Sequence, residues 1–166
     1  KVTGQDVEVL SSNGLHKLGG ADFDHALWKL VAEKYKEESG EELSFDEFSI
    51  NDAEDAKKSI SERKKTTVEI EREFVDLSRI EFEECISSMI AQIEMMCEST
   101  LDEAEIDASE ISEVFLAGGS TRMPVIREIA KNVFQREPSS TVNVDEVVAL
   151  GASLYAAHKS DGSNLT

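Results

Sequence analysis

Residues 115–124 read Phe-Leu-Ala-Gly-Gly-Ser-Thr-Arg-Met-Pro: an apolar run, two glycines, two hydroxyls, an arginine and a proline. The apolar part predicts a short buried strand over residues 113–117, and Pro124 predicts the start of a helix. Glycines let the backbone approach a ligand closely, and amides at a helix N-terminus attract anions. Arg122 adds a cation that also stacks on aromatic rings. A tight strand-to-helix turn needs glycines for its own conformation, so a nucleotide site and a plain turn both stay open.

A second group of polar residues shares one face of a helix that we predict over residues 51–63. Glu54, Lys57, Lys58 and Ser61 recur at spacings that place them on a single helical stripe. A carboxylate, two ammonium groups and a hydroxyl in that arrangement suit a ligand with several hydroxyls and ring nitrogens. An ordinary salt-bridged surface helix has the same spacing and remains the alternative. The core candidates of this helix are Ala53, Ala56 and Ile60.

Two further segments place glycines or an acid before a helix. Gly19 and Gly20 lie in a Leu-Gly-Gly-Ala-Asp-Phe-Asp run, where Asp22 is expected to open the helix. Asp145 is expected to cap a last helix over residues 146–158. That helix is apolar nearly all round, which predicts burial on more than one side.

The middle of the chain predicts a helical region with a small hairpin. The hairpin covers residues 66–77, and a capping box of Ser78 and Glu81 follows it. Behind the box, an apolar stripe from Phe82 to Leu101 predicts one continuous long helix.

The composition excludes several classes of function. Among 166 residues, 35 are acidic and 17 basic, for a net charge of -18, which disfavours binding to nucleic acid or to an anionic membrane. No apolar run approaches the ~20 residues that span a bilayer. Cys85 and Cys97 lie about 18 Å apart on the predicted helix, too far for a disulfide. Free thiols without a signal-peptide pattern favour the cytoplasm. The three histidines are scattered, so no metal site is expected.

Four segments together resemble the DnaK/HscA-type heat-shock chaperones of the actin-like ATPase superfamily. They cover residues 18–24, 53–61, 115–124 and 144–152, in the order of the family's motifs. The resemblance spans roughly Val7 to Ala157 and corresponds to the second lobe of the nucleotide-binding domain. It implies an α/β fold, an actin-like ATPase lobe in which a small mixed sheet with flanking helices joins a helical subdomain with a short β-hairpin. The implied division is a first part of the sheet-containing subdomain in 1–40, the helical subdomain with hairpin and long helix in 41–110, the second part of the sheet-containing subdomain in 111–158 and a tail in 159–166.

The resemblance also implies an adenosine site. Glu54 and Lys57 would hydrogen-bond the ribose, and Ser61 would meet the edge of the adenine. Lys58 and Arg122 would flank the two adenine faces. The nucleotide-binding residues so implied are Glu54, Lys57, Lys58, Ser61, Gly118, Gly119, Ser120, Arg122, Asp145, Gly19 and Gly20, with no catalytic or metal-binding residue among them.

The function implied is that of an ATP-dependent chaperone that couples ATP binding and hydrolysis to the binding of unfolded peptides. ATP/ADP would be the ligand, with Mg²⁺ in the intact protein, and a J-domain co-chaperone and a nucleotide exchange factor would be partners. The family's first lobe and peptide-binding domain are missing here, so the chain alone is expected to bind nucleotide weakly and not to hydrolyse it. An exposed sheet edge is expected to pair two copies.

Two alternatives stay open. One is a degenerate, non-enzymatic interaction module whose acidic face recruits a co-chaperone. The other is a lobe of a different actin-like ATPase, such as a sugar kinase or a filament protein.

Overall fold

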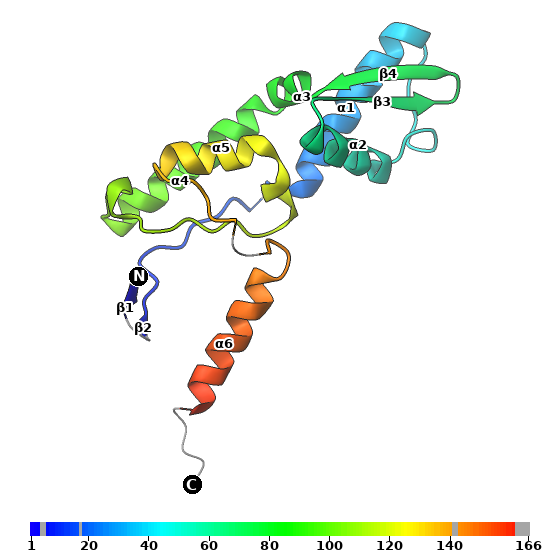
Figure 1. Ribbon diagram of the computed structural model, residues 1–166. Helices are drawn as coiled ribbons and strands as arrows, with labels where there is room; N and C mark the ends of the chain where they lie inside the picture. Colours follow the sequence, from blue (N-terminus) through cyan, green and yellow to red (C-terminus); the bar gives the residue numbers. More distant parts are fainter. Residues whose placement is uncertain (4–5, 17, 141–142, 162–166) are drawn as a thin grey trace.

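The computed structural model describes residues 1–3, 6–16, 18–140 and 143–161, and Figure 1 shows their arrangement. Within these residues, six α-helices and two antiparallel two-stranded sheets confirm a mixed α/β chain. No helix in this part of the chain is long and apolar enough to cross a membrane. In chain order the elements are β1 (Val2–Thr3), β2 (Asp6–Val7), α1 (Gly20–Ser39), α2 (Ile50–Glu62), β3 (Lys65–Ile70), β4 (Glu73–Ser78), α3 (Arg79–Cys85), α4 (Ser87–Ala104), the 3-10 helices η1 (Ala108–Glu110) and η2 (Gly119–Arg122), α5 (Pro124–Val133) and α6 (Val147–Asp161).

One hydrophobic core joins α1, α2, the β3–β4 hairpin and α3. The apolar stripe of α1 is buried in it, with Leu27 and Val31 fully enclosed. The predicted hairpin is confirmed, with Val75 and Leu77 of β4 turned into the core. All three core candidates of α2 are buried as well: Ala53, Ala56 and Ile60. This shared core fixes α1 and α2 against each other, and the polar face of α2 is thereby held in one place.

Helix α1 starts earlier than its sequence suggests. We expected Asp22 to open it, but the cap residue is Gly19 and the helix begins at Gly20. The Asp22 carboxylate instead reaches back and accepts a hydrogen bond from the Gly19 N–H at 2.8 Å. The expectation was wrong because an acid three residues inside a helix satisfies the same free amides as an acid at its cap. At the other end, Gly40 closes α1 with a left-handed φ of 76°.

The predicted long helix is two helices. Its helical dihedral angles stop at Ile86, with φ -96° and ψ 11°, between α3 and α4. Ile86 is fully buried, so the break lies in the core and not in solvent. On one side α3 packs against α1 and β4, and on the other α4 packs against α5. The helix breaks at Ile86, where the two halves of the apolar stripe pack against different neighbours.

The predicted strand over residues 113–117 is reduced to a single bridge. Phe115 pairs with Ser139 in parallel, and the Ser139 N–H donates to the Val114 carbonyl at 2.8 Å. A strand needs a neighbour along its length, and in the described ranges this segment meets one only at Ser139. The expected small mixed sheet is therefore represented here by two antiparallel hairpins and one parallel bridge.

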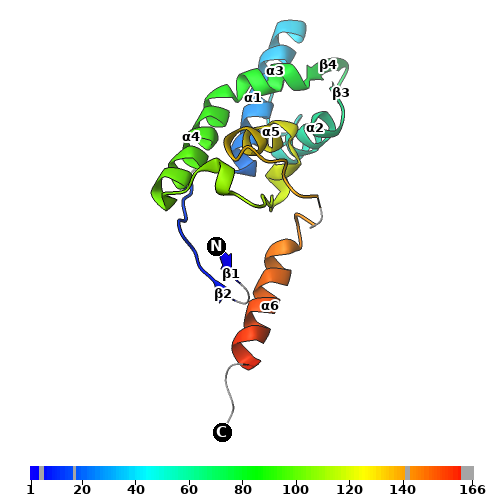
Figure 2. The same ribbon diagram turned by 60° about the vertical axis from the view of Figure 1, so that its left-hand side comes forward.

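Helix α6 extends away from the other helices in both views (Figures 1 and 2). Its large apolar side chains are exposed: Val148 by 70%, Leu154 by 73% and Tyr155 by 57%. The sequence predicted burial for this helix, and nothing in the described part of the chain provides it. The helix runs to Asp161, and residues 162–166 of the predicted tail lie outside the described residues.

The start of α3 carries a carboxylate with a lowered pKa. Glu81 accepts hydrogen bonds from Lys34 Nζ at 2.7 Å and from the Ser78 Oγ and N–H at 2.6 and 2.9 Å. These bonds lower the pKa of Glu81 from 4.5 to about 2, and the bond from Lys34 has the largest effect. A folded-state pKa below the unfolded one stabilises the protein above pH 4.5, and this stabilisation is lost as the pH falls toward 2.

We therefore expect Glu81→Gln to lower the free energy of unfolding by about 1 kcal/mol at pH 7, the usual size of a lost helix cap. The difference from the unsubstituted chain should shrink between pH 4.5 and pH 3, because the carboxylate is then partly protonated in the unfolded state. Urea unfolding at several pH values measures it. Glu37→Gln, an exposed substitution on α1, is the control. A difference that stays constant with pH would contradict the assigned role of the charge.

Candidate functional site

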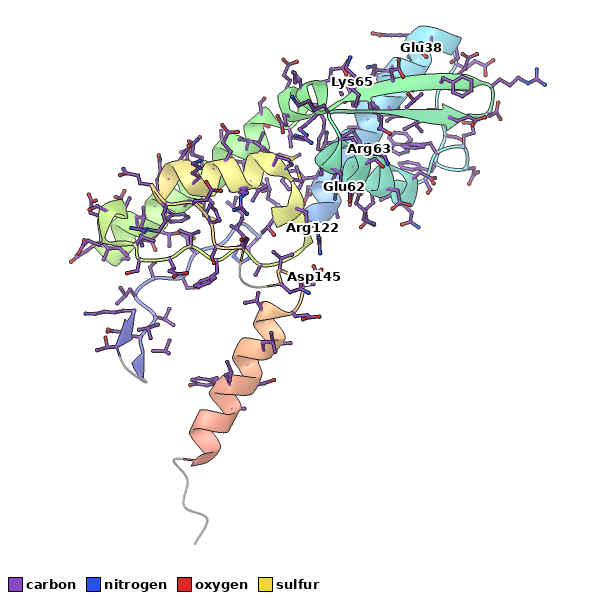
Figure 3. The ribbon with its side chains drawn as sticks, in the orientation of Figure 1. Glu38, Glu62, Arg63, Lys65, Arg122 and Asp145 are labelled. Atoms are coloured by element: carbon purple, nitrogen blue, oxygen red, sulfur yellow. The ribbon has the colours of Figure 1, made fainter. Side chains whose placement is uncertain are left out.

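A cleft of about 1070 Å³ lies between α2, the first turn of α1 and the segment from η2 to the start of α5. It collects residues that are far apart in sequence. Figure 3 shows Arg122 and Asp145 close together near the start of α6, with Glu62 at the end of α2 above them. The residues that line the cleft are Gly20, Ala21, Asp24, Glu54, Lys57, Lys58, Ser61, Glu62, Gly119, Ser120, Thr121, Arg122, Met123, Pro124, Arg127, Val144 and Asp145.

The polar face of α2 forms one wall. Lys58 Nζ lies 3.1 Å from both Glu54 Oε1 and Asp55 Oδ1, and these hydrogen bonds raise the pKa of Lys58. Ser61 Oγ donates to the Lys57 carbonyl at 2.8 Å and keeps its lone pairs for another donor. The wall thus presents an acceptor, a cation and a hydroxyl, as the helical spacing predicted.

The wall opposite is the glycine-rich turn. Gly118 has a left-handed φ of 88°, which favours glycine, and its N–H donates to the Val144 carbonyl at 2.8 Å. This bond ties the turn to the residue before Asp145. Pro124 is the first residue of α5, as predicted. The turn therefore presents the backbone of Gly119 and Ser120 to the cleft without large side chains between.

Asp145 does not cap the last helix. Its carboxylate forms an ion pair with Arg122, and its own N–H donates to Asn143 Oδ1 at 3.0 Å. The Val147 N–H bonds to the Asn143 carbonyl, so the chain turns before α6 begins. The cap prediction was wrong because the pairing partner of Asp145 lies 23 residues away, and helix-start rules consider only neighbours.

Asp24 and Lys57 form the buried floor of the cleft. Lys57 Nζ lies 2.5 Å from Asp24 Oδ1, and the two side chains are only 11% and 10% exposed. Lys57 Nζ also donates to the Gly20 carbonyl at 3.4 Å. The sequence analysis did not include Asp24 among the site residues. Its position next to Phe23 on the buried stripe of α1 was a usable signal, because a buried acid normally has a partner.

Of the eleven site residues implied by the resemblance, nine line the cleft. The other two, Gly19 and Gly118, lie beside it and support it: Gly19 caps α1, and Gly118 holds the turn to Val144. A cleft lined by these residues does not by itself establish a ligand, so their binding roles stay predictions.

The cleft differs in charge from the rest of the molecule. The chain carries a net charge of -18, whereas the lining contains four acids and four cations. An anionic ligand therefore meets less repulsion there than over most of the surface. Nowhere in the described residues do three or more His, Cys, Asp or Glu gather in a way that holds a metal ion. The charged residues counted are Asp24, Glu54, Glu62, Asp145, Lys57, Lys58, Arg122 and Arg127.

Comparison with known proteins finds both a family model and individual relatives that match this chain. The family model described as "Hsp70 protein" matches residues 2–164. A protein of Vibrio atlanticus (strain LGP32) named "Chaperone protein HscA homolog" is 40% identical over 152 residues. The match covers 90% of this chain and 24% of that relative.

Proposed function

The chain belongs to the Hsp70 family, and from that premise we propose that it is the adenosine-binding lobe of an ATP-dependent molecular chaperone. The observation that carries the proposal is the cleft, because it unites three motifs that are separated in sequence. The face of α2, the first turn of α1 and the glycine-rich turn each supply lining residues. If these polar residues only covered the surface, nothing would bring the three segments together in one cleft.

The chemistry of the two walls suits an adenosine. A ribose diol needs both an acceptor and a donor, and Glu54 and Lys57 supply one of each. Lys58 and Arg122 stand on opposite sides of the cleft, where cations stack on the faces of an aromatic ring. Both cations already contact carboxylates, so a bound adenine would share or displace those contacts. Ser61 has lone pairs for the amino group of the ring.

The phosphates of ATP or ADP would lie toward Gly20, Gly119 and Ser120. These residues offer backbone amides and a hydroxyl. The described residues do not fit Mg²⁺, because no acidic cluster lies in the cleft and Asp24 is engaged by Lys57. We therefore assign the metal, and the residues that split ATP, to other parts of the parent protein.

In that parent protein, ATP binding and hydrolysis would be coupled to the binding of unfolded peptides. The match to 24% of a chaperone relative supports a longer parent with a first lobe and a peptide-binding domain. A J-domain co-chaperone, a nucleotide exchange factor and a cytoplasmic setting belong to the same proposal. So do the actin-like lobe, with its division at residues 40, 110 and 158, and the pairing of two copies through a sheet edge.

We expect the isolated chain to bind ADP with a Kd on the order of 0.1 mM, about -5.5 kcal/mol, since it offers one side of the nucleotide site. Isothermal titration calorimetry measures the affinity. Phosphate release from ATP should equal the rate without protein, because the chain positions neither metal nor attacking water. An absence of ADP binding at millimolar concentration would contradict the adenosine assignment. Turnover at the rate of an intact chaperone ATPase would contradict the partial role.

A further inference from the structure

The buried pair of Asp24 and Lys57 is not explained by adenosine binding alone. Asp24 Oδ1 is sealed from solvent, and it accepts no hydrogen bond among the described residues. This oxygen forms an ion pair with Lys57 Nζ, which lies 2.5 Å away. Asp24 lines the cleft, but its side chain is only 10% exposed and this oxygen faces Lys57, so we argue its role in binding through Lys57.

The ammonium group of Lys57 is held from the α1 side. Asp24 Oδ1 and the Gly20 carbonyl both lie on that side, at 2.5 and 3.4 Å from Nζ. A lysine ammonium has three donors. Lys57 also lines the cleft, so an ammonium group held by these two groups on the α1 side still has donors for a ligand there.

Lys58, the next residue, shows the contrast. Its side chain is 58% exposed, and its partners Glu54 and Asp55 are themselves exposed. It is free to move with its partners, whereas Lys57 is fixed by groups on another helix. A donor fixed before binding loses less conformational freedom and discriminates more strongly between ligands with and without an acceptor.

We propose that Asp24 is a positioning residue that fixes the Lys57 ammonium toward the ribose hydroxyls and so sets the preference for nucleotides that carry them. The inference rests on the proposed function. The α1–α2 contact thereby becomes part of ligand selection: Asp24 lies on α1, and the group that it directs lies on α2.

The test compares ADP with 2′,3′-dideoxy-ADP by calorimetry on the full 166-residue chain. The unsubstituted chain is expected to prefer ADP about 10-fold, the size of one hydrogen bond to a charged group. Asp24→Asn keeps the shape and removes the charge, and its preference is expected to fall to about 2-fold or less. Asp46→Asn, the same change in an exposed turn, should keep the full preference.

The ratio of the two affinities, for ADP and for dideoxy-ADP, distinguishes a positioning role of Asp24 from a purely structural one. Loss of affinity for both nucleotides by the same factor would overturn the proposal. General damage to the cleft weakens binding whether or not the nucleotide carries ribose hydroxyls. If Asp24→Asn does not fold, Asp24→Leu with Lys57→Met replaces the pair by apolar groups, a change that buried pairs often tolerate. This double variant lacks the Lys57 donor, so its preference for ADP should fall as far as that expected for Asp24→Asn, and a preference as large as in the unsubstituted chain would overturn the proposal.

Failure of the proposed function gives a different result. An unsubstituted chain that does not bind ADP refutes the adenosine site, and the role of Asp24 with it. An unsubstituted chain that binds ADP and dideoxy-ADP equally leaves the adenosine site standing and refutes only the role of Asp24.

Discussion

Replacing Glu54 and Arg122 together by alanine is expected to weaken ADP binding by about 100-fold. The two side chains act from opposite walls of the cleft, Glu54 on the ribose and Arg122 on a face of the adenine. Hydrogen bonds and ring contacts of charged groups are each worth about 1.5 kcal/mol when partly exposed, and two such losses multiply to about 100-fold. Calorimetry with ADP measures the change.

The matched control for that variant is Glu38→Ala with Arg72→Ala. It removes the same two charge types at exposed sites, and Figure 3 shows Glu38 at the far end of α1 from Arg122. ADP affinity should be unchanged in the control. Equal affinity in the unsubstituted chain, the control and the Glu54/Arg122 variant would refute the assigned pocket while leaving the family membership untouched.

Phe82→Ala is expected to lower the free energy of unfolding by about 3–5 kcal/mol. Phe82 is 2% exposed in the middle of α3, in the core shared by α1, α2 and the hairpin. Removing the ring leaves a cavity that the surrounding helices cannot fill. Since a domain of this size is stable by roughly 5–15 kcal/mol, the loss is a large part of the total. Urea unfolding followed by circular dichroism gives the value.

Phe74→Ala is the control, because it makes the same chemical change on the hairpin where the ring is 61% exposed. Its effect should stay below about 1 kcal/mol. Comparable losses from the two substitutions would show that the core does not lie where α1, α2 and α3 meet.

The family and the main helices followed from sequence alone. Four motifs in order indicated a DnaK/HscA-type chaperone, and the match of an Hsp70 model to residues 2–164 confirms it. The face of α2 was predictable because side chains that recur at helical spacing lie on one stripe wherever the helix packs. The hairpin, the box of Ser78 with Glu81 and the start of α5 at Pro124 were predictable for a similar reason, since each depends on neighbours within a few residues.

The start of α1 was misjudged locally, between Gly19 and Asp22, but the other errors concern contacts between distant residues. Asp145 pairs with Arg122 instead of capping a helix, and Ile86 breaks a helix whose apolar stripe is continuous. Residues 113–117 have strand character but find a partner only at Ser139. In each case the outcome depends on a residue far away in the sequence, and rules based on neighbouring residues do not include it.

The sequence by itself determined which residues share a helix face, where α3 and α5 begin and to which family the chain belongs. These features depend on short spacings and on the order of motifs. Only the tertiary structure decided that α2, the start of α1 and the glycine-rich turn enclose one cleft, and that Asp24 lies beneath Lys57. The physical reason is that an ion pair depends on the distance between two charges, and Asp24 and Lys57 come within 2.5 Å only because a shared apolar core packs α1 against α2.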